Sequence, residues 1–285
     1  PNTRLRSVAR NPLPPGSSGF GILAESGGAM DNRRRRLVIW GGGHADYSGN
    51  ELYAFSLETL TWSVIWPGTP IEQIPTASRN HNTYLDGNPS SRHTRDGVEY
   101  LPVLDQFFSN GGSVWKNGGN DRSTWVFDFA TGKWIRKAYP PDTQYTNVYS
   151  AYDPDTGNMY VIRPQATDKS GTLVYKYDPF HNTWQRLNKS AYYGHRRTAA
   201  YDPNTKKLLL GGMGQVIVWD MNQPSSPGVT AHSGLTGVLA RPGWGIEYDH
   251  YIDRFVVWAQ GPSIFYIHPV TLEIVEHELA ADSPG

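Results

Sequence analysis

A block that recurs along the chain is the feature that most constrains its fold. Each copy has an apolar run, paired glycines, a strand that ends in aromatic or acidic residues, a short turn and a tryptophan. The clearest copy covers Leu37–Trp62, and a second covers Phe107–Trp134. Such a unit cannot bury both faces of its own small sheet, so it must stack against copies of itself. The repeat therefore predicts a series of similar stacked sheets.

The spacing of tyrosine-aspartate pairs indicates how large each unit is. Tyr152, Tyr201 and Tyr248 recur at intervals of 49 and 47 residues, and each is followed by Asp in a turn. Asp-Pro with Thr-Gly or Asn-Thr favours a tight turn, because Pro presets φ and Asp or Asn bonds its own backbone. We expect an all-β chain, a β-propeller of four-stranded blades in a single domain over residues 1–285. Five blades are readable, at about 20–66, 97–138, 148–188, 196–236 and 244–279.

The third strand of each expected blade is rich in β-branched and aromatic residues with partial alternation, as a half-buried strand requires. These strands are Leu52–Phe55, Thr124–Phe129, Leu173–Asp178, Val216–Asp220 and Ser263–Ile267. Trp62, Trp134 and Trp184 follow the next turns and are expected to pack one blade against the next.

The glycine and aromatic-acidic pairs resemble those of a known family. The pairs are Gly42-Gly43, Gly111-Gly112 and Gly211-Gly212, and Phe127-Asp128, Tyr177-Asp178 and Trp219-Asp220. The pattern resembles the kelch-repeat, galactose oxidase-like propellers over about the whole chain. Kelch rings commonly close with six or seven blades, so either the segment Leu5–Arg10 adds a strand that closes the ring or the chain ends early. The absence of cysteine excludes the cysteine-tyrosine copper site of galactose oxidase.

Composition excludes several function classes. The 26 basic and 26 acidic side chains balance, so no global field draws the chain to nucleic acid. No run of about 18 apolar residues exists, so no membrane span is expected. The run Arg33–Arg36 is expected to be a solvated turn, with an anion-binding patch as the alternative. The N-terminus lacks an apolar signal-like stretch. We expect a bacterial protein, periplasmic or secreted, whose signal peptide is absent from this chain.

The loops of greatest length are expected on one face of the propeller. In a four-stranded blade, the loop that enters the inner strand and the loop between the second and third strands emerge together. The segments on this face are 44–51, 68–97, 113–122, 143–149, 163–171, 192–198 and 241–245. They are rich in His, Arg, Tyr and Trp, so a basic mouth lined with aromatic side chains is predicted. Loops of this kind on a rigid scaffold commonly carry function.

A basic, aromatic-lined mouth favours an acidic, uronate-containing polysaccharide as ligand. Arginine binds carboxylates bidentately, and tryptophan stacks on the apolar face of a sugar ring. The candidate substrate-binding residues are His44, Arg95, Trp115, Arg163, Arg196, Arg197 and Trp244. Trp115 lies in a glycine-rich loop and is expected to be exposed.

Cleavage of that polymer by β-elimination is the candidate reaction. It requires a neutralised sugar carboxylate and a base near the reacting carbon. The candidate catalytic residues are His93, His195, Tyr193 and Tyr145. This resembles the His/Tyr/Arg chemistry of propeller-type polysaccharide lyases in residue types alone, with no shared motif, so enzymatic activity stays an open question in which a lyase is favoured.

Three alternatives remain. The same face suits a non-catalytic module that binds glycan or protein. His44, His93 and His195 could hold zinc, although no HxH or HExxH spacing supports a metal, and neither metal nor other cofactor is expected. His44 follows three glycines, where a purely structural hydrogen bond is an equal explanation.

Overall fold

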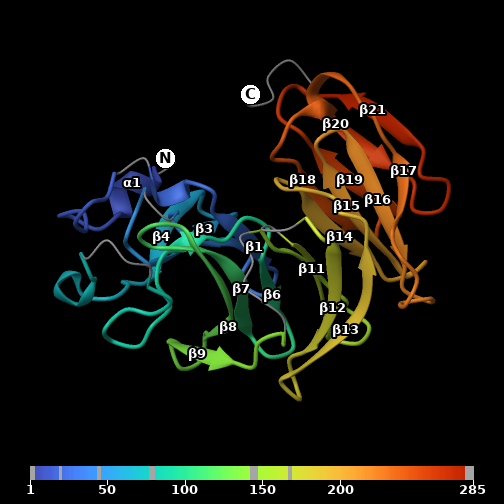
Figure 1. The fold of residues 1–285 in the computed structure, drawn as a ribbon. Helices are drawn as coiled ribbons and strands as arrows, with labels where there is room; N and C mark the ends of the chain where they lie inside the picture. Colours follow the sequence, from blue (N-terminus) through green and yellow to red (C-terminus); the bar gives the residue numbers. More distant parts are fainter. Residues whose placement is uncertain are drawn as a thin grey trace. The chain divides into compact units, whose positions relative to one another are not determined.

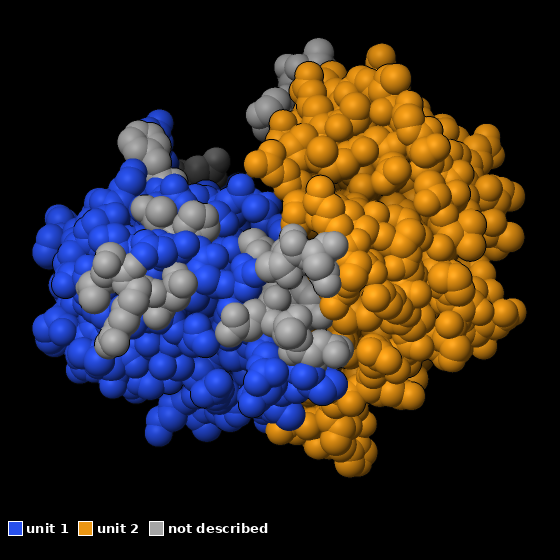
Figure 2. Space-filling view, in the orientation of Figure 1, with its two compact units in different colours: residues 1–148 blue, residues 149–285 orange. Residues whose placement is uncertain are grey.

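The computed structural model describes residues 4–18, 21–43, 46–76, 81–141, 147–165 and 169–279. The chain is all-β, with five antiparallel sheets that each form one blade of a β-propeller (Figure 1). It divides into two compact units, residues 1–148 and 149–285 (Figure 2). The fold class and the number of blades are confirmed. That the chain is one domain stays a prediction.

Unit 1 contains the first two blades. The first sheet has the strand order β1-β2-β3-β4, and in the second the inner position beside β7 is divided between β5 and β6. The strands are β1 (Gly27–Asp31), β2 (Arg36–Trp40), β3 (Leu52–Ser56), β4 (Thr61–Trp66), β5 (Arg92–His93), β6 (Val98–Leu101), β7 (Gln106–Val114), β8 (Gly119–Asp128) and β9 (Lys133–Lys137). The helices are α1 (Leu5–Val8), η1 (Gly21–Leu23) and η2 (Ile71–Gln73).

Unit 2 contains three blades, each with strands in sequence order. The strands are β10 (Tyr149–Tyr152), β11 (Met159–Pro164), β12 (Thr172–Asp178), β13 (Thr183–Ser190), β14 (Thr198–Asp202), β15 (Lys207–Gly212), β16 (Gln215–Asp220), β17 (Val229–His232), β18 (Gly245–Asp249), β19 (Arg254–Trp258), β20 (Ser263–Ile267) and β21 (Ile274–Glu278). One short helix, η3 (Gly237–Ala240), precedes β18.

The core of unit 2 lies between neighbouring blades, because the middle blade is buried on both faces. Successive side chains of a strand point to opposite faces. Accordingly Leu208 and Leu210 of β15 pack with the β10–β13 sheet, and Leu209 between them packs with the β18–β21 sheet. This explains the near-continuous apolar run of β15, where a sheet with one solvated face would alternate.

The core of unit 1 uses aromatic residues in the same position. Trp134 of β9 contacts Trp40 of β2 with ring centroids 4.8 Å apart, and both side chains are buried. Phe127 and Phe107 pack around the same indole, at 5.5 and 6.3 Å. Trp134 therefore packs one blade against the next, as expected.

The paired glycine of the second blade is required by close packing. Gly112 has φ +100°, and a Cβ on it would lie 2.4 Å from the carbonyl oxygen of His93. A side chain there would meet backbone, which cannot move aside cheaply. The glycine thus lets β5 pair with β7 at Arg92 and His93.

The N-terminal segment forms no strand. Residues Leu5–Val8 form helix α1, and Leu5 is buried with Ile22, Ile39 and Tyr53 of the first blade. The prediction that Leu5–Arg10 adds a strand is therefore wrong, because the segment buries its leucine against blade one as a helical turn. Among the described residues no helix is long and apolar enough to cross a membrane.

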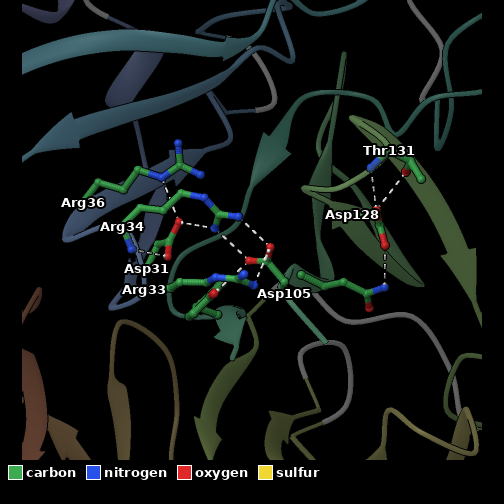
Figure 3. Close-up of polar contacts among 9 residues, drawn as sticks. Asp31, Arg33, Arg34, Arg36, Asp105, Asp128 and Thr131 are labelled. Carbon is green, nitrogen blue, oxygen red and sulfur yellow. Dashed lines mark hydrogen bonds and ion pairs between the residues drawn. The ribbon is translucent and has the colours of Figure 1, made fainter. Parts of the chain in front are cut away.

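The arginine run forms ion pairs in unit 1 (Figure 3). Arg34 donates to both carboxylate oxygens of Asp105, over 2.7 and 2.5 Å, and Arg36 donates to Asp31 over 2.8 Å. The Arg34 hydrogen bonds lower the pKa of Asp105 to about 2. Arg33 and Arg35 are exposed. Two arginines of the run are thus solvent-exposed, and the other two form polar contacts. Arg34 links the turn after β1 to the turn after β6.

Candidate functional site

The residues predicted to form one mouth are divided between the two units. His93, Arg95 and Trp115 belong to unit 1, and the remaining described candidates belong to unit 2. His44 and Tyr145 lie outside the described residues. A single pocket lined by residues of both units stays a prediction.

Trp115 is buried, which corrects the expectation that it is an exposed sugar platform. It is 2% exposed and packs with Ile74 and Tyr84 of the segment that precedes β5. Its backbone N–H donates to Ser91 over 2.9 Å, and its carbonyl accepts from His81 over 2.7 Å. Described parts of the insert, around Ile74 and Tyr84, cover this indole, and the glycine-rich sequence around Trp115 gave no sign of that cover.

Two other candidates of unit 1 lie beside acids. Arg95 pairs with Glu25, so its guanidinium is compensated within the protein. His93 is largely buried on β5, with Nε2 3.5 Å from Asp46 Oδ2. The substrate-binding role of Arg95 and the catalytic role of His93 stay predictions.

In unit 2, Trp244 is also buried rather than exposed. It is 2% exposed and lies in the core between the blades of β14–β17 and β18–β21. A Cβ on Gly211 would lie 2.8 Å from its ring. The glycine therefore makes room for the indole, and Trp244 is a packing residue. Arg163 is buried on β11, opposite Leu173 of β12.

The loop of residues 191–197, which leads into β14, gathers the remaining candidates. His195 and Arg196 are exposed, and Arg197 is buried directly behind them. The hydroxyl of Tyr192 lies 2.9 Å from Nε2 of His195. Gly212 and Gln215 flank the tight turn between β15 and β16 and contact the same arginine. The sheet β14–β17 is the fourth blade in chain order. We call the residues at this end of it the blade-4 rim: Tyr192, His195, Arg196, Arg197 and Gln215.

The tyrosine beside His195 is Tyr192, not Tyr193. Tyr193 donates its hydroxyl to Gly228 over 2.9 Å and packs edge-on against Trp219, with ring centroids 5.7 Å apart. Burial raises its pKa. Its hydroxyl is hydrogen-bonded to Gly228, just before the outer strand β17, so the catalytic role expected of Tyr193 is not supported by its position.

Arg197 is the central residue of the rim. Its Nε donates to Tyr193, Nη1 donates to the Gly212 carbonyl over 2.5 Å, and Nη2 donates to Gln215 Oε1 over 2.6 Å. All three acceptors are neutral. Burial lowers the pKa of the guanidinium, and the nearby phenols of Tyr149 and Tyr192 oppose that effect. Among the described residues no carboxylate pairs with it.

Five buried or partly buried arginines of unit 1 each form an ion pair with Asp or Glu: Arg10, Arg34, Arg36, Arg92 and Arg95. Buried charges without a partner are costly. Arg197 differs from these five arginines in having neutral acceptors.

Few acidic residues lie near the rim in the sequence. Between Asp178 and Glu247 the acids are Asp202 and Asp220, which end β14 and β16. Four or five residues of strand place them roughly 13–17 Å from the first residues of those strands, which is too far for an ion pair with Arg197. At those far ends Lys207 pairs with Asp220 and Lys206 pairs with Asp155.

Metal ligation has no support at this rim. Within the described ranges no three His, Cys, Asp or Glu side chains gather into a group that could hold a metal ion. The zinc set considered from the sequence includes His44, outside those ranges, and residues of both units.

Comparison with known proteins supports the fold alone. No family model matches the chain and no curated protein matches it, so its assignment to the kelch family stays a prediction. One solved structure, a crystal structure of a nidogen/laminin complex, contains a similar chain with a TM-score of 0.57 at 11% sequence identity. The similarity covers 88% of this chain and 78% of that chain.

Proposed function

We propose that the chain binds an acidic, uronate-containing polysaccharide at the blade-4 rim. The observation that carries the proposal is Arg197, a buried guanidinium whose described partners are all neutral. A guanidinium has five N–H groups, and three are used, so two remain for a carboxylate. Charge-assisted hydrogen bonds to a planar anion are stronger than neutral ones.

The surrounding groups suit a sugar acid. His195 and Tyr192 present polar groups beside the arginine, and Arg196 is exposed next to them. The two tryptophans expected to stack on sugar, Trp115 of unit 1 and Trp244 of unit 2, are both buried. Recognition is therefore proposed to depend on charge and hydrogen bonds rather than on stacking against these two indoles.

The test compares binding of oligogalacturonate with binding of a neutral oligosaccharide of equal length, by calorimetry. The acidic ligand is expected to bind more tightly, and Arg197→Gln should weaken it about tenfold to a hundredfold, given roughly 1.5–3 kcal/mol for a charged hydrogen bond. Arg186→Gln is the matched control, because Arg186 is exposed on β13. Thermal melting verifies that each variant is folded. Equal losses in both variants would refute the proposal.

Cleavage of the bound polymer is a second candidate, favoured by the hydrogen bond between Tyr192 and His195. In β-elimination a base takes the proton on the carbon beside the carboxylate, a carbon-carbon double bond forms, and the glycosidic oxygen leaves with a proton. Arg197 would stabilise the negative charge that develops on the carboxylate.

The elimination is tested by the ultraviolet absorbance of the unsaturated product. Tyr192→Phe should abolish product formation and retain most of the binding. Tyr193→Phe, which loses only the bond to Gly228, should retain turnover. Binding without any unsaturated product would leave a non-catalytic glycan-binding module. Capture of a protein partner in place of glycan would instead favour a protein-binding module.

A further inference from the structure

Among the described residues, the side chain that meets the guanidinium of Arg197 is a neutral amide. Gln215, the first residue of β16, accepts a hydrogen bond from Arg197 Nη2 through its Oε1, over 2.6 Å. Glutamate has the same shape and would place a carboxylate oxygen at this point. The position is thus one at which an ion pair could form within the protein and does not.

Two largely buried arginines of unit 1 are paired with carboxylates, whereas Arg197 meets an amide. At Arg92, which is similarly buried, Asp121 Oδ2 lies 2.6 Å from Nη1. At Arg10, Glu51 Oε1 lies 2.6 Å from Nε. These distances equal that between Arg197 and Gln215, so the geometry suits a carboxylate and only the chemistry of the acceptor differs.

We propose that Gln215 is a specificity-determining residue, which orients Arg197 without neutralising it so that the charge is available to a ligand carboxylate. This inference rests on the proposed function for its ligand. The amide fixes one terminal nitrogen of the fork, and the Gly212 carbonyl fixes the other. A guanidinium held in this way loses little rotamer freedom when an anion binds.

Arg197 keeps two N–H groups for an anion, and a carboxylate accepts two parallel hydrogen bonds from such a fork. A tetrahedral sulfate ester can accept the same pair, so the uronate carboxylate follows from the proposed function and is tested against sulfate by experiment. Oligogalacturonate and a heparin-derived oligosaccharide of equal length are the probes that distinguish the two anions.

The experiment uses two substitutions at residue 215 in the full chain. Gln215→Glu supplies the missing acid, so it should raise the melting temperature by about 2–4 °C and weaken oligogalacturonate binding at least tenfold. Gln215→Leu removes one of the three acceptors that orient Arg197 and keeps the charge, so it should lower the melting temperature and weaken binding, but by less than Gln215→Glu does, because the carbonyls of Tyr193 and Gly212 still hold the guanidinium. A purely structural role would change melting alone and would not separate the two variants in binding.

The outcomes separate this inference from the proposed function. If Gln215→Glu leaves the melting temperature unchanged or lowers it, Arg197 has no uncompensated charge and the inference is wrong, whatever the wild type binds. If the variant is stabilised but still binds the polyuronate, the inference is also wrong, because the ligand does not use Arg197. If the variant is stabilised and the wild type binds neither probe, the uncompensated charge stands and the proposed function fails. Tighter binding of the heparin-derived probe would overturn the assignment of a uronate carboxylate as the group that Arg197 binds.

Discussion

Single side chains decide whether charge in this protein is structural or available to a ligand. Arg10 and Arg197 are both largely buried cations that donate to backbone carbonyls. Arg10 also pairs with Glu51, whose side chain is 2% exposed, and Arg197 meets only neutral acceptors. Arginine therefore forms a structural ion pair in unit 1 and is a candidate ligand-binding residue in unit 2.

The Arg10–Glu51 ion pair should stabilise the folded protein. Burial raises the pKa of Glu51, and Arg10 opposes that effect. Arg10→Met should lower the free energy of unfolding by about 3 kcal/mol, because it leaves a buried carboxylate uncompensated. Adding Glu51→Gln should recover part of the loss, since the amide needs no counter-charge. Urea unfolding measures both effects.

Arg4→Met is the control, because Arg4 is exposed in the same N-terminal segment. It should change the free energy of unfolding by less than about 0.5 kcal/mol. If the two single variants are equally stable, the ion pair does not hold the segment.

Among elements, the paired glycines matter because strands approach each other closely there. Gly112 of β7 faces the carbonyl of His93 on β5. Gly112→Ala should destabilise the protein by about 3 kcal/mol or more, since the added carbon would meet backbone at a positive φ. Gly132 also has a positive φ, +66°, but nothing lies within 4 Å of its Cβ position. Gly132→Ala should therefore cost only about 1 kcal/mol. Equal melting temperatures for the two variants would contradict this account.

The blades themselves could be predicted because their signals are local. Alternation of apolar residues, turn chemistry and the 49- and 47-residue spacing are contained within short segments. The expected third strand Val216–Asp220 is found as Gln215–Asp220, and Ser263–Ile267 is found unchanged. The helix at Leu5–Val8 could not be predicted from local sequence, because it is held by the packing of Leu5 and Val8 against residues of the first blade.

The stability of the whole protein should decrease at acid pH. The pKa of Asp105 is lowered to about 2, chiefly by hydrogen bonds from Arg34. The pKa of Asp220 is also lowered, chiefly by a hydrogen bond from Lys207. A carboxyl whose pKa is depressed in the folded state stabilises it above the unfolded pKa, and that contribution is lost as the pH falls through the folded value.

Stability should therefore fall between about pH 4 and pH 2, which the melting temperature at pH 7, 4, 3 and 2 would measure. Asp105→Asn should be less stable than the wild type at pH 7 and should converge with it near pH 2. A constant difference between the two proteins across that range would show that the Arg34–Asp105 contact is not linked to pH.

The sequence by itself determined the repeat, the five blades and the basic character of the loop segments, because these depend on the order of residues over short distances. The tertiary structure decided which candidates face a ligand. Trp115 and Trp244 are covered by segments distant in sequence, and adjacent tyrosines point to different partners, Tyr192 to His195 and Tyr193 to Gly228. Burial and charge pairing are properties of contacts between separate segments. Only the folded chain shows that, among the described residues, Gln215 rather than an acid accepts a side-chain hydrogen bond from Arg197.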